Sequence, residues 1–428
     1  MSYEWEKIRL GDVSKVITDK IEISEINKKN YISTENMLPN FEGVVPASTI
    51  PNAKKVNAFR AKDILFSNIR TYFKKVWYAT MDGGCSADVL VFRPKNSAID
   101  NQFLSYVLKN EKFISYTVTT SKGTKMPRGD KKAIMNYQFY KPNLIDQQKI
   151  TYILSTLDDK IELNKKINQT LESIAQAIFK SWFVDFDPVH AKANAQSEDE
   201  YDAIAKELGI SREILDLFPS EFEESEVGLI PKGWEIKSLD QVAHFQNGLA
   251  LQKFRPKGNS FLPVLKIAQL KRGYCDDEEK ADVNIKEECI VDSGDVIFSW
   301  SGSLIVDIWC SGKAALNQHL FKVTSNTFPK WFYYFWVVEH LKKFQAIAAD
   351  KAVTMGHIKR SHLTEAKCLI PPKSLFFKVD IIIKSLIDSL INTRLENINL
   401  ERYKEKLLPK LLSGEIDVSN LNLGPEHD

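Results

Sequence analysis

The sequence contains an internal repeat, which constrains the possible folds more than any other feature. When the chain is shifted against itself by 229 residues, Trp5 lies over Trp234 and Pro142 over Pro371. An apolar helical pattern that includes Ile150 repeats at the same offset. Two copies of one unit predict a molecule with pseudo-twofold symmetry. Such a molecule suits a target that has two similar halves.

Length and composition are those of a globular protein with more than one core. The chain has 428 residues, of which 43% are hydrophobic, enough for two or three domain cores. Its N-terminal segment is charged, and no apolar run reaches the roughly 18 to 20 residues of a membrane span, so we expect a cytoplasmic protein. The five cysteines are scattered and never spaced as C-x-x-C, which predicts reduced thiols rather than a zinc site.

Charge is distributed unevenly along the chain. Residues 1–145 carry 23 Lys and Arg against 14 Asp and Glu, and residues 231–372 carry 19 against 15. Residues 185–230, between the copies, hold 13 acidic side chains against 3 basic ones. Two basic units around an acidic connector are expected if the units bind a polyanion. Ordinary variation of surface charge is the alternative.

Each copy is predicted to be an α+β unit. Short β-branched and aromatic runs such as 64–66 and 76–78 alternate with turn residues and indicate strands. A helix is expected over 103–116. In the second copy, residues 294–299 take the place of 62–67, which requires a gap of two or three residues in a loop.

Each copy ends at a proline and continues into a long helix. Over 146–184, apolar residues recur alternately four and three residues apart, and the segment lacks Pro and Gly. This 3.5-residue period is typical of a coiled-coil seam, and about 40 helical residues would extend roughly 60 Å. A second helix, over 373–414, is the expected partner. The residues predicted to pair the helices are Leu154, Leu157, Ile161, Asn164, Asn168, Ile383, Leu386, Leu390, Thr393 and Asn397.

Polar residues interrupt this seam near its middle, at Asn164 and Asn168 in one helix and Thr393 and Asn397 in the other. A polar side chain in a seam costs stability and fixes the register. Because two direct repeats are related by a twofold axis across the helices, we expect antiparallel packing. The alternative is two separate amphipathic helices, each packed on its own unit.

Three further segments resemble the specificity subunit of Type I restriction-modification systems. They are F-K-S-W-F-V-D-F-D-P-V at 179–189, G-L-I-P-K-G-W-E at 228–235 and L-L-P-K-L-L-S-G-E at 407–415. The resemblance implies two target-recognition domains, each recognising one half of a split double-stranded DNA site. It also implies that the helices space these domains and dock methyltransferase subunits, of which we expect two, with restriction subunits joining the complex. One departure is that the first helix starts with polar residues, whereas the second starts with Phe376 and Phe377.

The predicted architecture combines the repeat with this resemblance. It is an α+β fold with two pseudo-symmetric target-recognition domains, each followed by a long helix, the helices being packed as an antiparallel coiled coil. The predicted segments are target-recognition domains at 1–145 and 231–372, long helices at 146–184 and 373–414, an acidic connector at 185–230 and a flexible C-terminal tail at 415–428. Within the connector we expect helices at 198–208 and from Ser211. Two interpretations of the connector stay open, a mobile tether and a surface that closes the ring or binds a methyltransferase subunit, and we expect a mixture of the two.

The sequence gives little support for catalysis by this chain. It has no G-x-G-x-x-G that opens a helix after a strand, no G-x-x-x-x-G-K-[ST] and no H-E-x-x-H. We therefore expect no enzyme activity and no bound cofactor. The resemblance implies that S-adenosylmethionine, ATP and Mg²⁺ bind to partner subunits in DNA methylation and restriction. A stand-alone DNA-binding regulator and an enzyme with an unrecognised active site remain as alternatives.

Two kinds of DNA contact are predicted. The basic loop at 121–132 and its counterpart at 350–360 suit phosphate oxygens. Polar side chains after strands suit base edges, and because they differ between the copies we expect an asymmetric split sequence. The aromatic run 331–336 is interpreted as core. The candidate DNA-binding residues are Asn68, Arg70, Lys74, Lys75, Lys122, Lys125, Arg128, Lys131, Lys132, Gln269, Lys271, Arg272, Trp300, Ser301, Ser303, Lys351, His357, Lys359 and Arg360.

Overall fold

A computed structural model describes residues 5–276, 278–350 and 356–422. The chain divides into two compact units, Met1–Ile161 with Leu400–Asp428, and Glu162–Asn399. Two long helices, α5 (Leu144–Phe183) and α13 (Lys373–Ser413), each contribute residues to both units. We call residues 5–143 module 1 and residues 231–372 module 2.

Module 1 is built in three layers, two sheets and a helical layer. A four-stranded sheet has the order β2 (Ser14–Ile17), β9 (Val89–Pro94), β6 (Ile64–Ser67), β7 (Val76–Tyr78). A second sheet has the order β3 (Lys20–Glu22), β5 (Lys55–Phe59), β8 (Gly83–Cys85), β4 (Tyr31–Ile32), and β1 (Glu6–Arg9) pairs with β10 (Gln138–Lys141). Strand β6 is buried throughout because its alternate residues point to opposite faces. Phe66 packs with Phe113 on the helical side, and Leu65 packs with Phe59 on the side of the second sheet.

Module 2 repeats the first sheet strand for strand, with the order β14 (His244–Asn247), β21 (Leu320–Thr324), β18 (Val296–Ser299), β19 (Val306–Ile308). Its other strands are β13 (Glu235–Ser238), paired with β22 (Lys367–Ile370), and the sheet β16 (Lys280–Ala281), β15 (Leu262–Leu265), β20 (Ala314–Leu316), β17 (Ile290–Val291). Strands β17, β20 and β15 pair as β5, β8 and β4 do in module 1. The added edge strand differs: β3 lies beside β5, whereas β16 lies beside β15. The repeat therefore covers the whole first sheet and three strands of the second sheet, and it ends at the added edge strand of the second sheet.

The helical layers of the two modules differ. The single helix predicted at 103–116 is wrong, because the structure has α2 (Asn101–Leu108) and α3 (Glu111–Thr119). Asn110 separates them, since its side chain accepts a hydrogen bond from the Lys112 amide and caps α3. Module 2 has Glu339 at that repeat position and one helix, α11 (Lys330–Ala349). Residues 331–336 are all buried there, which confirms that this aromatic run is core.

Shorter helices complete both modules and the connector. They are α1 (Leu10–Val13) and α4 (Lys131–Met135) in module 1, α9 (Leu239–Val242), α10 (Ile267–Arg272) and α12 (Arg360–Glu365) in module 2, and α6 (Asp187–Asn194), α7 (Tyr201–Glu207) and α8 (Arg212–Asp216) in the connector. Among the described residues, no helix combines the length and the apolar character that crossing a membrane requires.

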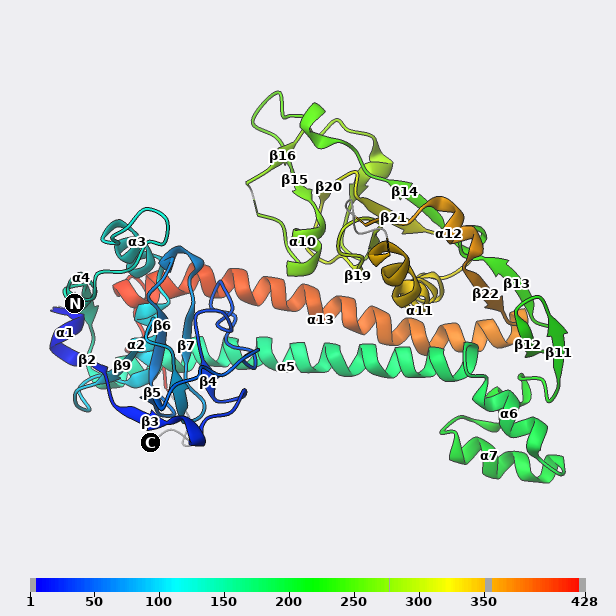
Figure 1. The fold of residues 1–428 in the computed structure, drawn as a ribbon, viewed down its shortest axis with the longest axis horizontal. Helices are drawn as coiled ribbons and strands as arrows, with labels where there is room; N and C mark the ends of the chain where they lie inside the picture. The colour runs from blue at the N-terminus through cyan, green and yellow to red at the C-terminus, as the bar shows by residue number, and fades with distance from the viewer. Residues whose placement is uncertain (1–4, 277, 351–355, 423–428) are drawn as a thin grey trace. The chain divides into compact units, whose positions relative to one another are not determined.

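The long helices lie side by side and run antiparallel, as the repeat predicted (Figure 1). In one unit the Asn164 side chain donates hydrogen bonds to Asn397 and Glu396, each at 2.8 Å. In the other unit Asp158 forms an ion pair with Lys404. Residue numbers rise along α5 where they fall along α13, so the pair is antiparallel.

The polar layer between the two long helices lowers the stability of the folded protein. Asn164, Asn168 and Asn397 are each at least nine-tenths buried. The Oδ1 atoms of Asn164 and Asn168 accept no hydrogen bond from the described residues, and a buried unsatisfied polar group costs about 1 to 3 kcal/mol. A slipped register would place these amides against aliphatic side chains, so the layer favours one alignment.

The apolar stripes of the long helices pack on the modules as well as on each other. Ile150 and Leu154 belong to the core of module 1 together with Leu411, while Val379 and Ile383 belong to the core of module 2. The alternative of helices packed on their own modules was thus correct in part. Of the residues predicted to pair the helices, Leu154, Ile161, Asn164, Asn168, Ile383, Leu390 and Asn397 are buried, and Leu157, Leu386 and Thr393 are partly buried.

A tyrosine from each helical layer fixes the module to the long helices. In module 1, Tyr106 donates to Asp158 at 2.8 Å, and Asp158 pairs with Lys404. Burial and this carboxylate raise the pKa of Tyr106 above its usual range, so the phenol stays protonated. In module 2, Tyr334 donates in the same way to Glu172 at 2.9 Å. Each tyrosine thus bonds to a carboxylate of α5.

The start of each long helix is attached to its module, by hydrogen bonds in module 1 and by aromatic packing in module 2. In module 1 the fully buried Gln147 accepts a hydrogen bond from the Asp100 amide at 2.8 Å and donates to the Pro142 carbonyl at 2.9 Å. Phe376 occupies the corresponding repeat position in α13, where its ring packs 4.9 Å from that of Phe332. A polar anchor has been replaced by an aromatic one.

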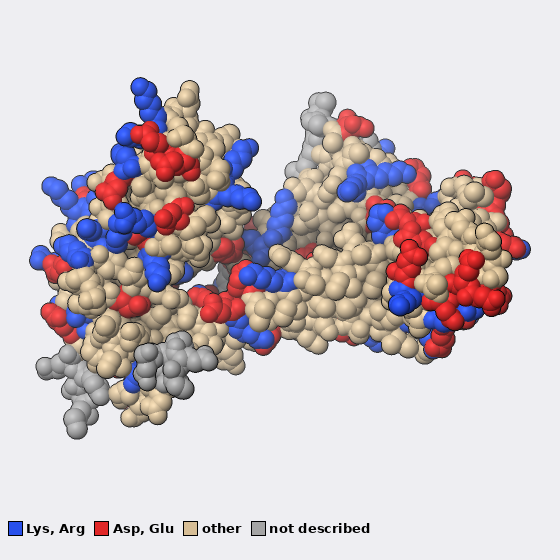
Figure 2. Space-filling model, turned by 90° about the horizontal axis from the view of Figure 1, so that it is seen from below, with Lys and Arg blue, Asp and Glu red and all other residues tan. Residues whose placement is uncertain are grey.

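The connector is folded rather than a mobile tether. Val189 and Phe218 are buried in the core of its unit, and the Lys192 ammonium donates to the carbonyls of Leu215 and Phe218. Helices α7 and α8 match the predicted positions closely, and the hairpin β11 (Phe222–Ser225) with β12 (Gly228–Pro231) leads into module 2. Acidic side chains gather over this part of the surface (Figure 2).

The start of the predicted flexible tail is packed as well. Val418 is buried and Ile416 partly buried against the core of module 1. Lys149 donates to the Ser419 carbonyl at 2.6 Å. The expectation of flexibility is therefore wrong for residues 415–422, and residues 423–428 lie outside the described part of the chain.

Candidate nucleic-acid interface

In module 1 the loop after β6 is joined to the predicted basic loop by the backbone. We call residues 68–75 tip 1 and residues 121–130 loop 1. The Arg70 amide donates to the Pro127 carbonyl at 2.8 Å, and the Gly129 amide donates to the Asn68 carbonyl at 3.0 Å. Two hydrogen bonds thus fix the position of tip 1 on loop 1.

Module 2 contains the same two hydrogen bonds. We call residues 300–305 tip 2 and residues 356–360 loop 2. The Gly302 amide donates to the Gly356 carbonyl at 2.8 Å, and the Ile358 amide donates to the Trp300 carbonyl at 3.0 Å. The loops correspond at the repeat offset of 229 and the tips at an offset of 232. The repeat therefore extends to individual backbone contacts, with a three-residue gap before the tip.

In each tip, the residue whose amide donates to the basic loop has a left-handed backbone. Arg70 has φ 49° and its counterpart Gly302 has φ 66°. This conformation suits glycine and costs other residues roughly 1 to 2 kcal/mol. Strain of this kind persists where surrounding structure fixes it and is often associated with function. Arg70 is consequently a better candidate for a functional side chain than its sequence context alone suggested.

The structure separates the predicted contacts of module 1 into exposed and structural groups. Asn68 is only 6% exposed, so its predicted role at a base edge is not supported by this position. Lys74 pairs with Glu111, and Lys75 donates to the Thr34 carbonyl at 2.6 Å. The exposed members are Lys122, Lys125, Arg128, Lys131 and Lys132, while Arg70 is partly buried.

Two of the exposed cations are already paired with carboxylates. Lys122 pairs with Asp130 at 2.5 Å and Arg128 with Asp88 at 3.1 Å. The Lys122 and Arg128 side chains are 80% and 58% exposed. Surface pairs of this kind are worth about 0 to 1 kcal/mol, so a phosphate can compete with the carboxylate.

The predicted contacts of module 2 are less basic. Ser301 is buried and its hydroxyl lies 2.8 Å from His319 Nδ1, whereas Ser303 is exposed. Trp300 is partly buried and donates from its indole to the Gln318 carbonyl. The remaining candidates are Lys359, which is exposed, His357, which is partly buried beside tip 2, and Arg360, whose exposed side chain donates to the Phe245 carbonyl. Lys351 lies outside the described residues.

Helix α10 carries three further predicted contacts. Lys271 and Arg272 are exposed, and Arg272 pairs with Asp276 at 2.6 Å while lying over the Tyr274 ring. Gln269 is partly buried, and its Oε1 accepts no hydrogen bond from the described residues. These side chains lie on an element separate from tip 2.

Sequence reasoning missed several residues at the tips. Tyr72 and Phe73 are 47% and 41% exposed. The aromatic pair lies between Arg70 and two lysines in the sequence, a pattern that could have been noticed. His319 was missed because only the fold brings it to tip 2.

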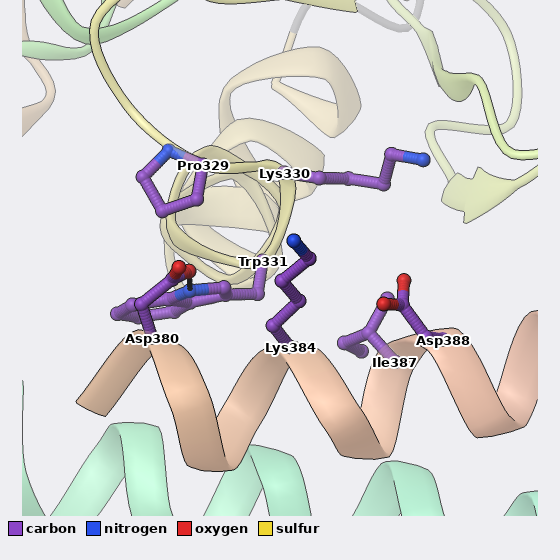
Figure 3. Close-up of a pocket in the computed structure, with 7 residues that line it drawn as sticks. All are labelled: Pro329, Lys330, Trp331, Asp380, Lys384, Ile387 and Asp388. Carbon is purple, nitrogen blue, oxygen red and sulfur yellow. Dashed lines mark hydrogen bonds between the residues drawn. The ribbon is translucent and has the colours of Figure 1, made fainter. Parts of the chain in front are cut away.

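A shallow depression of about 250 Å³ lies between the start of α11 and α13 (Figure 3). Its floor includes Trp331, whose indole donates to Asp380 at 2.7 Å. This bond joins the helical layer of module 2 to α13, so we interpret the depression as part of a structural contact. No group of three or more His, Cys, Asp or Glu suitable for a metal ion occurs within the described ranges.

Comparison with known proteins agrees with this geometry. The family model for the Type I restriction modification DNA specificity domain matches residues 3–173 and again residues 231–402. The chain belongs to the Type I restriction-modification specificity subunits. The two matches coincide with the two copies of the repeat, so each contains one tip and one basic loop.

Curated specificity subunits resemble the chain over most of its length. The HindI specificity subunit of Haemophilus influenzae is 25% identical over 460 aligned residues, covering 96% of this chain and 100% of that protein. The MjaIX specificity subunit of Methanocaldococcus jannaschii is 26% identical, covering 77% of this chain and 72% of that protein. A crystal structure of a Type I S subunit from M. genitalium has a TM-score of 0.54 at 14% identity, covering 96% of each chain, and supports the fold.

Substitutions at the two left-handed positions test whether each tip requires this backbone conformation. Gly302→Ala should lower the free energy of unfolding by about 1 to 2 kcal/mol, because alanine is strained at φ 66°. Arg70→Gly should change the free energy of unfolding by less than about 1 kcal/mol, since relief of backbone strain offsets the greater freedom of the unfolded chain. Urea unfolding measures both.

Gly258→Ala is the matched control for the alanine substitution. A Cβ there has no heavy atom within 4 Å, and the residue has no left-handed backbone. If Gly302→Ala were as mild as Gly258→Ala, the requirement for a left-handed residue at tip 2 would be disproved.

Proposed function

We propose that each module recognises one half of a bipartite, asymmetric DNA sequence within a Type I restriction-modification complex. The observation that carries this proposal is the repeated backbone frame of tip and loop with different side chains in the two copies. Arg70 is replaced by Gly302, and Asn68 is replaced by Trp300. A shared frame with different tips suits two half-sites of similar geometry and different sequence.

The exposed lysines of module 1 are assigned to phosphates. Lys125, Lys131 and Lys132 project from loop 1 and the start of α4 and are exposed. Phosphate contacts release counterions and position a protein on a duplex without selecting its sequence. Arg70, next to them in the fold, is the candidate for selecting a base, because a guanidinium can bind a guanine edge in bidentate fashion.

The long helices are assigned two roles, spacing and docking. As a spacer, the pair sets the unrecognised gap between half-sites, which we place at about one helical turn, or roughly 34 Å. As a docking surface, α5 exposes Leu163, Ile167 and Ile174, and α13 exposes Phe377 and Ile381. Spacings of four and seven residues put such side chains on one helical face, and exposed apolar surface favours a protein partner.

The partners we propose for these surfaces are two methyltransferase subunits, with restriction subunits joining the cytoplasmic complex. S-adenosylmethionine, ATP and Mg²⁺ would bind to those subunits, and this chain would supply recognition and not catalysis. Its own sequence contains none of the phosphate-cradling or metal-binding motifs discussed above.

The proposed function predicts a specific methylation pattern. Sequencing of host DNA for methylated adenine should show a gapped two-part motif that disappears when this gene is deleted. Methylation that is unchanged by deletion would contradict the proposal and favour a stand-alone DNA-binding regulator.

The same measurement can test the spacer. Seven residues inserted into both helices at the level of Asn164 and Asn397 add about 10 Å while nearly preserving the helical face. The gap in the motif should lengthen by about three base pairs. An unchanged gap would disprove spacing by the helices.

Phosphate binding by loop 1 predicts a general loss of affinity. Lys125→Ala combined with Lys131→Ala should weaken binding to every DNA sequence and reduce the slope of log affinity against log salt by about 2. Fluorescence anisotropy over a salt series measures this. Lys206→Ala, an exposed lysine of the connector, is the control and should leave the slope unchanged. A loss confined to the cognate sequence would contradict the phosphate assignment.

Docking on α5 predicts that charge on its apolar stripe blocks assembly. Leu163→Lys with Ile167→Lys should reduce the amount of methyltransferase subunit that co-purifies at least tenfold, because two ammonium groups would have to be desolvated. Gln176→Lys, an exposed polar position on another face of the helix, is the control. Normal co-purification of the double variant would exclude this stripe.

A further inference from the structure

Tip 1 carries an exposed aromatic pair that tip 2 lacks. Tyr72 and Phe73 lie in the 3-10 helix η2 (Thr71–Phe73), with ring centroids 4.7 Å apart. The loop between β6 and β7 spans residues 68–75, whereas the loop between β18 and β19 spans only 300–305. Before β19, module 2 has Leu304, which is buried. The extra length in module 1 thus exposes two aromatic rings.

The backbone around these rings is strained and firmly held. Arg70 and Lys74, on either side of η2, both have left-handed backbones, with φ 49° and 55°. The Asn40 amide donates to the Phe73 carbonyl at 3.0 Å, and the Phe41 amide donates to the Lys74 carbonyl at 2.9 Å. Because several hydrogen bonds fix this conformation, the rings are presented on a rigid support that loses little freedom on binding.

Tip 1 and loop 1 together carry six Lys and Arg side chains against one carboxylate, Asp130. The Lys75 ammonium lies 5.8 Å from the centre of the Phe73 ring. Loop 1, which is bonded to tip 1, adds the exposed Lys125 and Arg128. An apolar protein surface would have to desolvate these charges, whereas a nucleic acid neutralises them with phosphates. Charge complementarity therefore favours DNA as the occupant.

We propose that Tyr72 and Phe73 form an aromatic wedge that enters the half-site bound by module 1 and opens the stack between two adjacent base pairs. The proposal rests on the DNA-binding function proposed above. DNA-binding proteins insert apolar side chains between base steps and kink the duplex. Pyrimidine–purine steps unstack most easily, so such a step is expected at the wedge. Module 2, with its shorter tip, leaves its half-site stacked.

The test uses the full chain assembled with its methyltransferase subunits and a duplex that contains both half-sites, mapped beforehand by methylation sequencing. 2-Aminopurine, whose fluorescence rises when it unstacks, is placed at successive positions other than the methylated adenines, because methyltransferases turn their target base out of the stack. Fluorescence should rise at one step in the half-site of module 1 and at none in the other half-site. The double variant Tyr72→Ala with Phe73→Ala should lose this rise and bind the cognate duplex at least tenfold more weakly.

Two controls separate the wedge from a general effect on folding or charge. Tyr140→Ala removes an aromatic ring of module 1 with similar exposure, 46%, and should keep both the rise and the affinity. The salt slope of the Tyr72→Ala, Phe73→Ala variant should stay unchanged, because no cation is removed. Thermal unfolding confirms that this variant is folded.

The outcomes distinguish this proposal from the one it rests on. Absence of sequence-selective binding by the unaltered complex would overturn both. Selective binding without a fluorescence rise in the half-site of module 1 would overturn the wedge alone. Failure of the double variant to assemble with methyltransferase subunits, with unchanged DNA binding by the assembled fraction, would also overturn the wedge, because the rings would then contact protein.

Discussion

Each module completes its hydrophobic core with side chains from the two long helices, and the rest of the structure depends on this sharing. Ile150 and Leu154 from the first helix meet Leu411 from the second in the core of module 1. Phe179 and Ile383 come from the same two helices and belong to the core of module 2. Each buried aliphatic side chain is worth about 1.5 to 3 kcal/mol, so sliding one helix along the other would expose core residues in both modules. The Asn164–Asn397 hydrogen bond adds register selectivity to this apolar stabilisation.

The modules conserve their backbone frame and vary the parts attached to it. The first sheet, the two hydrogen bonds between tip and loop, and the left-handed residue in each tip are present in both copies. The edge strand of the second sheet and the length of the tip differ. Central strands are fixed by burial on both faces, whereas edges and hairpin tips meet solvent and tolerate change. The two copies therefore differ at solvent-facing positions and agree where strands are buried on both faces.

Several substitutions between the copies preserve a contact while changing its chemistry. Gln147 anchors the first long helix through hydrogen bonds, and Phe376 anchors the second through ring packing. Tyr106 bonds to Asp158 in one unit, and Tyr334 bonds to Glu172 in the other. The two phenylalanines that distinguish the second junction in the sequence have different environments in the structure. Phe376 is partly buried against the core of module 2, while Phe377 is 68% exposed and belongs to the proposed docking surface.

The sequence by itself determined the two copies, the positions of the long helices to within two residues, their antiparallel pairing and the buried aromatic run 331–336. Periodicity and repetition are local or directly countable signals, so they survive without tertiary information. The break between α2 and α3 follows a local cap at Asn110 that the predicted single helix overlooked. Only the tertiary structure decided that residues 415–422 are packed and which polar side chains reach the surface. Asn68 is buried beneath loop 1, Lys74 is paired with Glu111, and Tyr72 and Phe73 are exposed because of contacts with segments distant in the chain. Burial and pairing depend on which distant residues meet, and a single sequence does not encode that in any local pattern.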